Sequence, residues 1–135
     1  MAELKKLQDS QVALVVDDDA ITRLLIRRLM ERMGFAVVEA ADGEIAVREF
    51  RLLKPAIVIT DVSMPNMDGL AASAEMRKIR NLEDVPIIVM SGIDDRKTIK
   101  QAYEIGITEY LQKPINLSQL RNAVSSALPS PQPTA

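Results

Sequence analysis

The chain has 135 residues, of which 47% are hydrophobic and 27% charged, and its formal net charge is −2. This composition excludes a disordered chain and predicts one globular domain with a single core. The chain has no cysteine and no histidine, which excludes disulfides, thiolate metal sites, Ser-His-Asp triads and a phosphohistidine within these residues.

Short β-branched apolar runs alternate with longer segments of helical period from Val12 onward, a pattern typical of βαβ units and a parallel sheet. The predicted strands are residues 12–16, 36–39, 56–60, 86–90 and 109–111. Three of them are nearly continuous apolar runs, which indicates burial on both faces and a central position. The run 36–39 is shorter and is followed by a turn signal, Ala-Ala-Asp-Gly at 40–43, which favours an edge.

The helices that the pattern predicts between and after these strands are residues 20–33, 44–53, 69–79, 94–105 and 117–128. Apolar side chains recur at helical spacing in the first helix at Ile21, Leu24, Leu25 and Leu29. We expect this stripe to face the core, as we expect of Tyr103 in the fourth helix and Leu117 in the fifth. Asp68 is well placed to cap the third helix.

Strict alternation of five strands with five helices predicts an open, doubly wound α/β sheet. The domain is expected to span residues 12–128, after an N-terminal extension at 1–11. Residues 129–135 hold three of the seven prolines and are expected to form a tail or linker.

Polar residues follow several predicted strands at their carboxyl ends, where open α/β sheets bind ligands. They are Asp17, Asp18 and Asp19 after the first strand, Asp61 after the third, Ser91 after the fourth and Lys113 after the fifth. If the first and third strands are neighbours, three or four carboxylates converge and repel one another unless a cation joins them. Oxygen ligands open to water suit Mg²⁺, and a carboxylate beside Mg²⁺ can attack a phosphoryl group.

Four blocks of the sequence resemble the response-regulator receiver domain, the CheY-like family. They are LVVDDD at 14–19, IVITDVSMPNMDG at 57–69, PIIVMSG at 86–92 and YLQKP at 110–114. The blocks match in order and spacing and cover about residues 12–128. The resemblance implies a flavodoxin-like parallel sheet of strand order 2-1-3-4-5 with five helices.

The resemblance also implies a phosphoacceptor and a metal site. Asp61 would accept the phosphoryl group. Asp18, Asp61 and the backbone carbonyl of Ser63 would ligate Mg²⁺ directly, and Asp17 would act mainly through water.

A conformational switch is implied by the same resemblance. Lys113 would pair with Asp61 before phosphorylation and with the phosphoryl group afterwards, and the Lys113–Pro114 bond would be cis. Ser91 would be the switch hydroxyl, in place of the more usual threonine, and Tyr110 the coupled aromatic side chain that turns inward.

The first hypothesis for function is therefore a phosphoacceptor module of a two-component (His-Asp) phosphorelay. It would be no enzyme apart from catalysing its own phosphorylation and dephosphorylation. Since the chain has no histidine, a histidine kinase or histidine phosphotransfer protein must be the donor. Phosphorylation would switch the face formed by the last two strands and last two helices. The chain would be a stand-alone receiver that a downstream protein detects, or the N-terminal receiver of a longer regulator with an output domain. A phosphorylation-dependent homodimer is a further option.

Two other classes of function compete with this hypothesis. A Mg²⁺-dependent aspartyl phosphatase of the haloacid-dehalogenase type would use Asp17 and Asp19 as an Asp-x-Asp pair, but this leaves Asp61 without a role. We expect Asp19 at the helix start instead. A phosphate-independent, receiver-like scaffold would use only its surface, and the complete acidic set argues against it.

Charge and hydropathy also bear on partners. The net charge gives no reason to expect a nucleic-acid partner. No apolar run approaches the ~18 residues of a membrane span, and the first residues lack the apolar stretch of a signal peptide, so a cytoplasmic location is expected. Four basic residues lie at helical spacing at Arg23, Arg27, Arg28 and Arg32. We interpret this stripe as a solvated face, with a docking surface for an acidic partner as the alternative.

Overall fold

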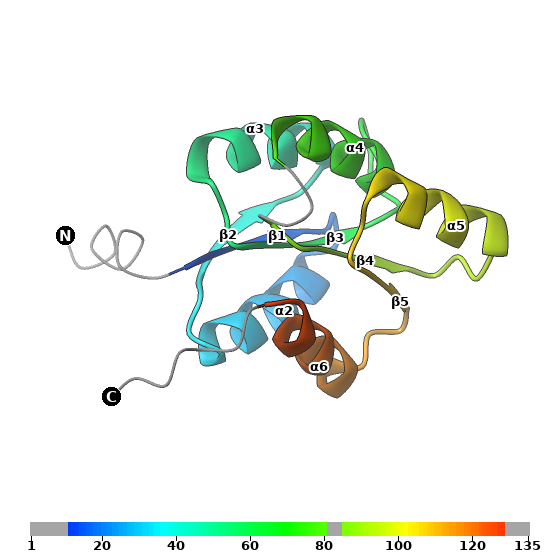
Figure 1. Cartoon of the computed structure of the whole chain (residues 1–135). Helices are drawn as coiled ribbons and strands as arrows, with labels where there is room; N and C mark the ends of the chain where they lie inside the picture. The colour runs from blue at the N-terminus through cyan, green and yellow to red at the C-terminus, as the bar shows by residue number, and fades with distance from the viewer. Residues whose placement is uncertain (1–10, 81–84, 129–135) are drawn as a thin grey trace.

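The computed structural model describes residues 11–80 and 85–128, which form a five-stranded parallel sheet with helices on both faces (Figure 1). The strands are β1 (Val12–Val16), β2 (Ala36–Ala40), β3 (Ile57–Asp61), β4 (Ile87–Ser91) and β5 (Glu109–Gln112). The helices are α2 (Ala20–Arg32), α3 (Gly43–Leu53), α4 (Gly69–Ile79), α5 (Arg96–Ile105) and α6 (Leu117–Ala127). Apart from Gln11, the expected extension at 1–11 and the expected tail at 129–135 lie outside the described residues.

Two hydrophobic layers enclose the sheet because successive strand side chains point to opposite faces. Val15 and Ile59 pack with α2 and α6 on one face, and Leu14 and Val58 pack with α3, α4 and α5 on the other. Figure 1 shows the same division, with α3, α4 and α5 above the sheet and α2 and α6 below it. Burial on both faces explains why the central strands are continuous apolar runs, as predicted.

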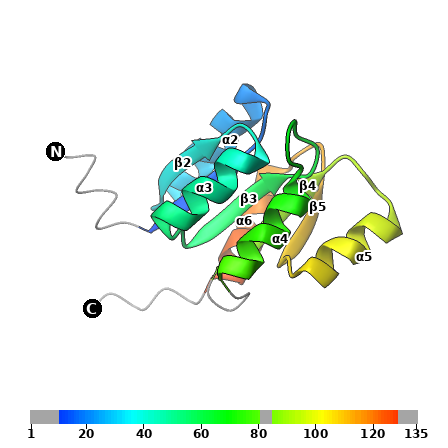
Figure 2. The same ribbon diagram turned by 90° about the horizontal axis from the view of Figure 1, so that it is seen from above.

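The strand order is β2-β1-β3-β4-β5, as the resemblance implies, so β1 lies between β2 and β3. Val16 near the end of β1 is in register with Thr60 near the end of β3. Figure 2 shows the strands running side by side, with the loops after them gathered at one edge. This order brings the residues after β1 next to the end of β3.

Strand ends differ from the prediction by one residue at the functional edge. Asp61 and Ser91 are the last residues of β3 and β4 rather than the first loop residues. The ladder continues this far because Val62 donates a backbone hydrogen bond to Met90 (3.0 Å) and Lys113 donates one to Ser91 (2.8 Å). Backbone pairing therefore holds both side chains in place more firmly than a loop would.

Helix boundaries agree with the prediction to within two residues. The largest difference is at α5, which begins at Arg96 because Asp95 is its N-cap and accepts a hydrogen bond from the Lys97 backbone N–H. Asp68 caps α4 as predicted, accepting from the Ala71 N–H at 2.8 Å. No helix in the described ranges has the length and apolar content of a membrane span.

The buried face of α2 is a different one from the face we expected. Its buried residues are Ile26, Leu29 and Met30, whereas Ile21 is 70% exposed and Leu25 48% exposed. The helix carries more apolar residues than one stripe can hold, and Leu29 belongs to both candidate stripes. Only the stripe aligned with the lower face of the sheet enters the core. The expectation was also wrong for Leu117 and Tyr103, which are exposed.

Candidate functional site

Three aspartates and one lysine meet at the carboxyl ends of β1, β3 and β5. Each of Asp17, Asp18 and Asp61 offers a carboxylate oxygen, and these oxygens lie within 4.8 Å of one another. Lys113 Nζ lies 2.9 Å from Asp61 Oδ2 and 3.2 Å from Asp17 Oδ2. Four residues separated by up to 96 positions in the sequence thus form one charged cluster.

Backbone hydrogen bonds hold the two buried aspartates of this cluster in place. Asp17 is fully buried, its N–H donates to the Ala40 carbonyl (3.1 Å), and its carboxylate accepts from the Asp19 N–H (2.9 Å). Asp61 is buried at the end of β3, and its Oδ1 accepts from the Ser63 N–H (3.3 Å). Both carboxylates are therefore oriented before any ligand binds.

A glycine allows α4 to begin directly against the end of β3. The Gly69 N–H donates to the Val62 carbonyl at 2.8 Å, and a Cβ at position 69 would overlap the carbonyl oxygen of Asp61. Any larger residue would displace the strand end that carries Asp61 or the start of the helix.

Burial and charge shift two of the titratable groups of the site. Burial raises the pKa of Asp17, although the hydrogen bond from Asp19 and the Lys113 ammonium act in the opposite direction. Burial by itself would lower the pKa of Lys113, but the hydrogen bond to Asp61 and the charges of Asp17 and Asp61 outweigh it, so this pKa is raised. The lysine is therefore firmly protonated and acts as a fixed cation.

The donor set fits a small, hard divalent cation. All ligand atoms offered by Asp17, Asp18 and Asp61 are carboxylate oxygens, and Asp18 is exposed to solvent. The carbonyl of Ser63 accepts no hydrogen bond within the described part of the chain. A cluster of three carboxylates with one ammonium retains excess negative charge, which a divalent cation such as Mg²⁺ would neutralise while keeping water ligands.

Ser91 ends β4 next to Lys113, and both Ser91 and Tyr110 form hydrogen bonds with the loop after β4. Ser91 is buried, and its Oγ accepts from the Ile93 N–H at 2.9 Å. The Tyr110 hydroxyl, on a partly buried side chain, donates to the Ile93 carbonyl at 2.8 Å. Both side chains therefore meet at one loop residue. The Lys113–Pro114 peptide bond is cis, as the resemblance implies.

The Asp19 carboxylate caps α2 and is not part of the cluster, as we expected. Its carboxylate accepts hydrogen bonds from the Ile21 and Thr22 N–H groups and from the Thr22 hydroxyl. The hydroxyl and backbone donors lower the pKa of Asp19. These contacts argue against the phosphatase hypothesis, in which Asp17 and Asp19 would form a catalytic pair.

Arg23 is a neighbour of the site that the sequence interpretation missed. Its Nη1 donates to the Asp17 carbonyl (2.7 Å), while its Nε pairs with Glu39 (2.9 Å), which also pairs with Arg27 (2.6 Å). The signal was present in the sequence, because Glu39 lies at the end of the strand predicted beside β1. Arg23 and Arg27, which we expected to be solvated, therefore form a partly buried ion-pair network with Glu39, and Arg23 joins this network to the backbone of Asp17.

Asp42 is a second neighbour of the site, and the sequence indicated it only as part of a turn. Asp42 caps α3 by accepting from the Ile45 N–H (2.9 Å), and it also accepts from Asn66 Nδ2 (3.1 Å). Asn66 adopts a left-handed conformation (φ 68°) in the loop that carries Ser63. This hydrogen bond links the β3–α4 loop to the start of α3.

Comparison with known proteins identifies relatives that share most of this chain. The family model "Response regulator receiver domain" matches residues 13–125. A "Probable transcriptional regulator ycf27" from Cyanophora paradoxa is 36% identical over 115 residues, which cover 85% of this chain and 47% of that protein. "Chemotaxis protein CheY" from Thermotoga maritima is 33% identical over 113 residues, which cover 83% of this chain and 92% of that protein.

A crystal structure of a response regulator receiver domain protein from Clostridium thermocellum has a TM-score of 0.79 and 29% identity. The alignment covers 87% of this chain and 93% of that one. The chain spans about half the length of several of the curated relatives that it matches.

Proposed function

The chain belongs to the response regulator receiver domain family, and we propose that it is the phosphoacceptor module of a two-component relay, phosphorylated on Asp61. The observation that carries the proposal is the position of Lys113, whose ammonium bridges the carboxylates of Asp61 and Asp17. A lysine placed on the acceptor carboxylate is suited to stabilise the charge that phosphoryl transfer adds there.

The proposed reaction moves a phosphoryl group from a histidine nitrogen of the donor to a carboxylate oxygen of Asp61. The Asp61 oxygen attacks phosphorus as the N–P bond breaks, and the leaving nitrogen keeps the bonding electron pair. Water later cleaves the acyl phosphate and restores the carboxylate with release of phosphate. Family membership implies a kinase as partner. A histidine kinase or histidine phosphotransfer protein is the proposed donor, since the chain has no histidine.

Mg²⁺ is part of the proposal because the donor set fits it. Asp18 and Asp61 would hold the ion directly, and Asp17 would hold it mainly through water. The Ser63 carbonyl would be a further direct ligand. When bound, Mg²⁺ neutralises charge on the carboxylates and on the phosphoryl oxygens. Lys113 then moves its contact from the carboxylate to the added group.

The readout is proposed to be a conformational change in β4, α5, β5 and α6. Ser91 and Tyr110 both form a hydrogen bond with Ile93. Movement of the Ser91 hydroxyl toward a phosphoryl group would therefore free the Ile93 N–H. This would alter the conformation of the loop that also holds Tyr110. A downstream protein or an output domain outside these residues would detect the change, with dimerisation through this face as a further proposal. The domain is proposed to act in the cytoplasm, with no direct contact to nucleic acid and with no catalysis beyond its own phosphorylation and dephosphorylation.

Acetyl phosphate with Mg²⁺ tests the proposal. We expect the intact mass to rise by one phosphoryl group, and we expect EDTA or Asp61→Asn to prevent this. Asp68→Asn is the matched control, because Asp68 is an exposed aspartate that caps α4 outside the cluster. Beryllofluoride with Mg²⁺ should also shift the amide resonances of Asp61, Ser91 and Tyr110.

Two results would contradict the proposal. Turnover of a generic phosphomonoester that Asp17→Asn abolishes and Asp61→Asn preserves would indicate a phosphatase. Absence of phosphorylation in a folded protein that still binds Mg²⁺ would indicate a phosphate-independent scaffold.

A further inference from the structure

The loop between β3 and α4 (residues 62–68) contributes Ser63 to the proposed Mg²⁺ site, yet much of this loop is exposed. Ser63, Pro65 and Asn66 are all exposed, so burial does not fix their backbone. Ser63 follows Asp61 by only two residues, but the orientation of its carbonyl depends on the course of the loop after it. A contact that holds this loop therefore also holds one of the proposed ligands of the ion.

The middle of the loop is a tight turn centred on Asn66. The Met67 N–H donates to the Pro65 carbonyl at 2.8 Å, which closes a three-residue γ-turn, and Asn66 between them has φ 68°. A γ-turn with a positive φ is rare and strained. Asparagine tolerates positive φ better than most residues do, but such a turn persists only where surrounding contacts hold it.

Two hydrogen bonds hold the turn, and both are made with the start of α3. Asn66 Nδ2 donates to Asp42 Oδ2 at 3.1 Å, and the Gly43 N–H donates to the Met67 carbonyl at 3.2 Å. A Cβ at position 43 would overlap that carbonyl oxygen, so the two segments lie in direct backbone contact. Within the described part of the chain, no other hydrogen bond joins residues 64–67 to another element.

The start of α3 is a firm support for the turn. Asp42 Oδ1 accepts from the Ile45 N–H at 2.9 Å and caps the helix, while Oδ2 accepts from Asn66. The Ile45 N–H and then the Asn66 amide lower the pKa of Asp42, although burial acts in the opposite direction. Two residues earlier, the Ala40 carbonyl accepts from the Asp17 N–H. The segment that supports Asp17 therefore also supports the turn, and α3 and α4 lie side by side above the sheet (Figure 1).

Backbone conformation by itself does not require an asparagine at position 66. Glycine adopts positive φ without strain, so it would serve the turn at least as well. Asparagine adds an amide that donates to a carboxylate on another element, and hydrogen bonds to charged groups are the stronger ones. Met64 and Met67 also pack in the hydrophobic layer beside α3 and α4, but apolar contacts are non-directional and do not orient a carbonyl.

We propose that Asn66 is a positioning residue for the cation, and that its hydrogen bond to Asp42 raises the affinity for Mg²⁺ by holding the loop that carries Ser63. Asn66 acts through the loop and is not a ligand. The inference rests on the proposed function only in that it requires the Mg²⁺ site. Because coupling between two sites is reciprocal, bound Mg²⁺ should in turn stabilise the contact between the turn and α3.

Asn66→Gly separates the side-chain contact from the backbone conformation. Glycine keeps the positive φ and removes the amide that bonds to Asp42. Amide spectra recorded during a Mg²⁺ titration of the unphosphorylated protein measure the affinity. We expect Asn66→Gly to bind Mg²⁺ about 3- to 10-fold more weakly than the wild type, because groups that orient a ligand affect metal affinity on this scale.

Asn66→Asp separates the contact from simple charge. It places a second carboxylate against Asp42, so the hydrogen bond is replaced by repulsion. The added negative charge would by itself strengthen Mg²⁺ binding, whereas loss of the contact should weaken it by about 3-fold or more. Asn122→Asp adds the same charge at an exposed position on α6 and is the matched control, with an affinity within about 2-fold of the wild type.

A double variant restores the contact with its polarity exchanged. When Asp42→Asn is combined with Asn66→Asp, the amide at position 42 can donate to the carboxylate at position 66. Asparagine is as good an N-cap as aspartate, so α3 keeps its cap, and the net charge equals that of the wild type. We expect the Mg²⁺ affinity to return to within about 2-fold of the wild type, which a purely destabilising effect of Asn66→Asp would not allow.

Hydrogen exchange at the Gly43 amide reports on the contact directly, since this N–H donates to Met67. We expect exchange to be about 3-fold or more faster in Asn66→Gly, and slower in the wild type when Mg²⁺ is added. Labelling by acetyl phosphate in excess Mg²⁺ should occur in both proteins. Failure of the wild type to be labelled while the Mg²⁺ results hold would contradict the phosphoacceptor function and not this inference.

Several results would overturn the inference. They are equal Mg²⁺ affinity in Asn66→Gly and the wild type, tighter binding by Asn66→Asp, no recovery in the double variant, and no effect of Mg²⁺ on exchange at Gly43. Absence of Mg²⁺ binding by the folded wild type would overturn it as well.

Discussion

Replacing Lys113 by methionine removes the cation that pairs with Asp17 and Asp61. The two contacts of 3.2 and 2.9 Å correspond to a gross attraction of about 5 kcal/mol each at an effective dielectric constant of 20. Carboxylate oxygens within 4.8 Å of one another repel by at least about 3.5 kcal/mol on the same scale. The lysine side chain is 26% exposed, so solvent screening and the cost of burying its charge remove much of this attraction. We expect a net loss of about 2–3 kcal/mol in the free energy of unfolding at pH 7.

Urea unfolding in EDTA, followed by circular dichroism, measures this loss. A double-mutant cycle with Asp61→Asn isolates the pair. Asp61→Asn by itself should cost less than about 1 kcal/mol, because loss of the ion pair is offset by relief of repulsion among the carboxylates. In the Lys113→Met background the same change should recover stability. Lys97→Met, an exposed lysine at the start of α5, is the matched control and should shift stability by less than about 0.5 kcal/mol.

The reasoning is refuted if Lys113→Met unfolds within about 0.5 kcal/mol of the wild type with an unchanged m-value. It is also refuted if the two substitutions are additive, because additivity would mean that the lysine and the carboxylate do not interact in solution.

Three further predictions follow from packing and charge. Gly69→Ala should lose about 2 kcal/mol of stability in urea unfolding, because the added Cβ overlaps the last carbonyl of β3. Gly92→Ala is the control and should lose less than about 0.5 kcal/mol, because nothing lies within 4 Å of its added Cβ. Ile26→Ala should cost about 2–4 kcal/mol and Ile21→Ala less than about 0.5 kcal/mol, and equal costs would contradict the buried face of α2. Burial would raise the pKa of Glu39, but pairing with two arginines outweighs it and lowers this pKa below its ordinary 4.5. Ionised Glu39 therefore stabilises the folded state above pH 4.5, and this stabilisation is lost as the pH falls through the folded-state pKa. Glu39→Gln should therefore be about 1 kcal/mol less stable at pH 7 and approach the wild type below pH 4 in thermal or urea unfolding.

Local patterns along the chain were sufficient to predict the elements and most of the site's members. Runs of β-branched apolar residues and helical periodicity are local properties of the sequence. They located all five strands and all five described helices to within two residues. Capping is local as well, which is why the roles of Asp19 and Asp68 at helix starts were predictable. Asp17, Asp61 and Lys113 were recognisable because each follows a predicted strand, and parallel strands end at one edge of a sheet.

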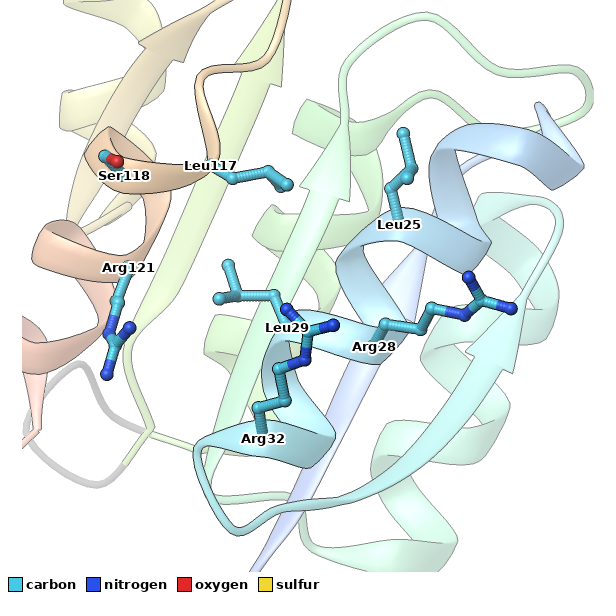
Figure 3. Close-up of a pocket in the computed structure, with 7 residues that line it drawn as sticks. All are labelled: Leu25, Arg28, Leu29, Arg32, Leu117, Ser118 and Arg121. Atoms are coloured by element: carbon cyan, nitrogen blue, oxygen red, sulfur yellow. The ribbon is translucent and has the colours of Figure 1, made fainter.

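Which helix faces are buried and which charged side chains pair could not be predicted from local patterns, because both depend on the packed fold. Periodicity shows that α2 has apolar stripes, but the position of the sheet selects Ile26 and Met30 for burial and leaves Leu25 exposed in a groove between α2 and α6 (Figure 3). The same rotation of the helix divides its arginines, because Arg23 reaches Glu39 on β2 whereas Arg28 borders a groove between α2 and α6. Contacts between elements depend on strand order and helix orientation, which are set by the summed packing of the whole core and by no single segment of the chain.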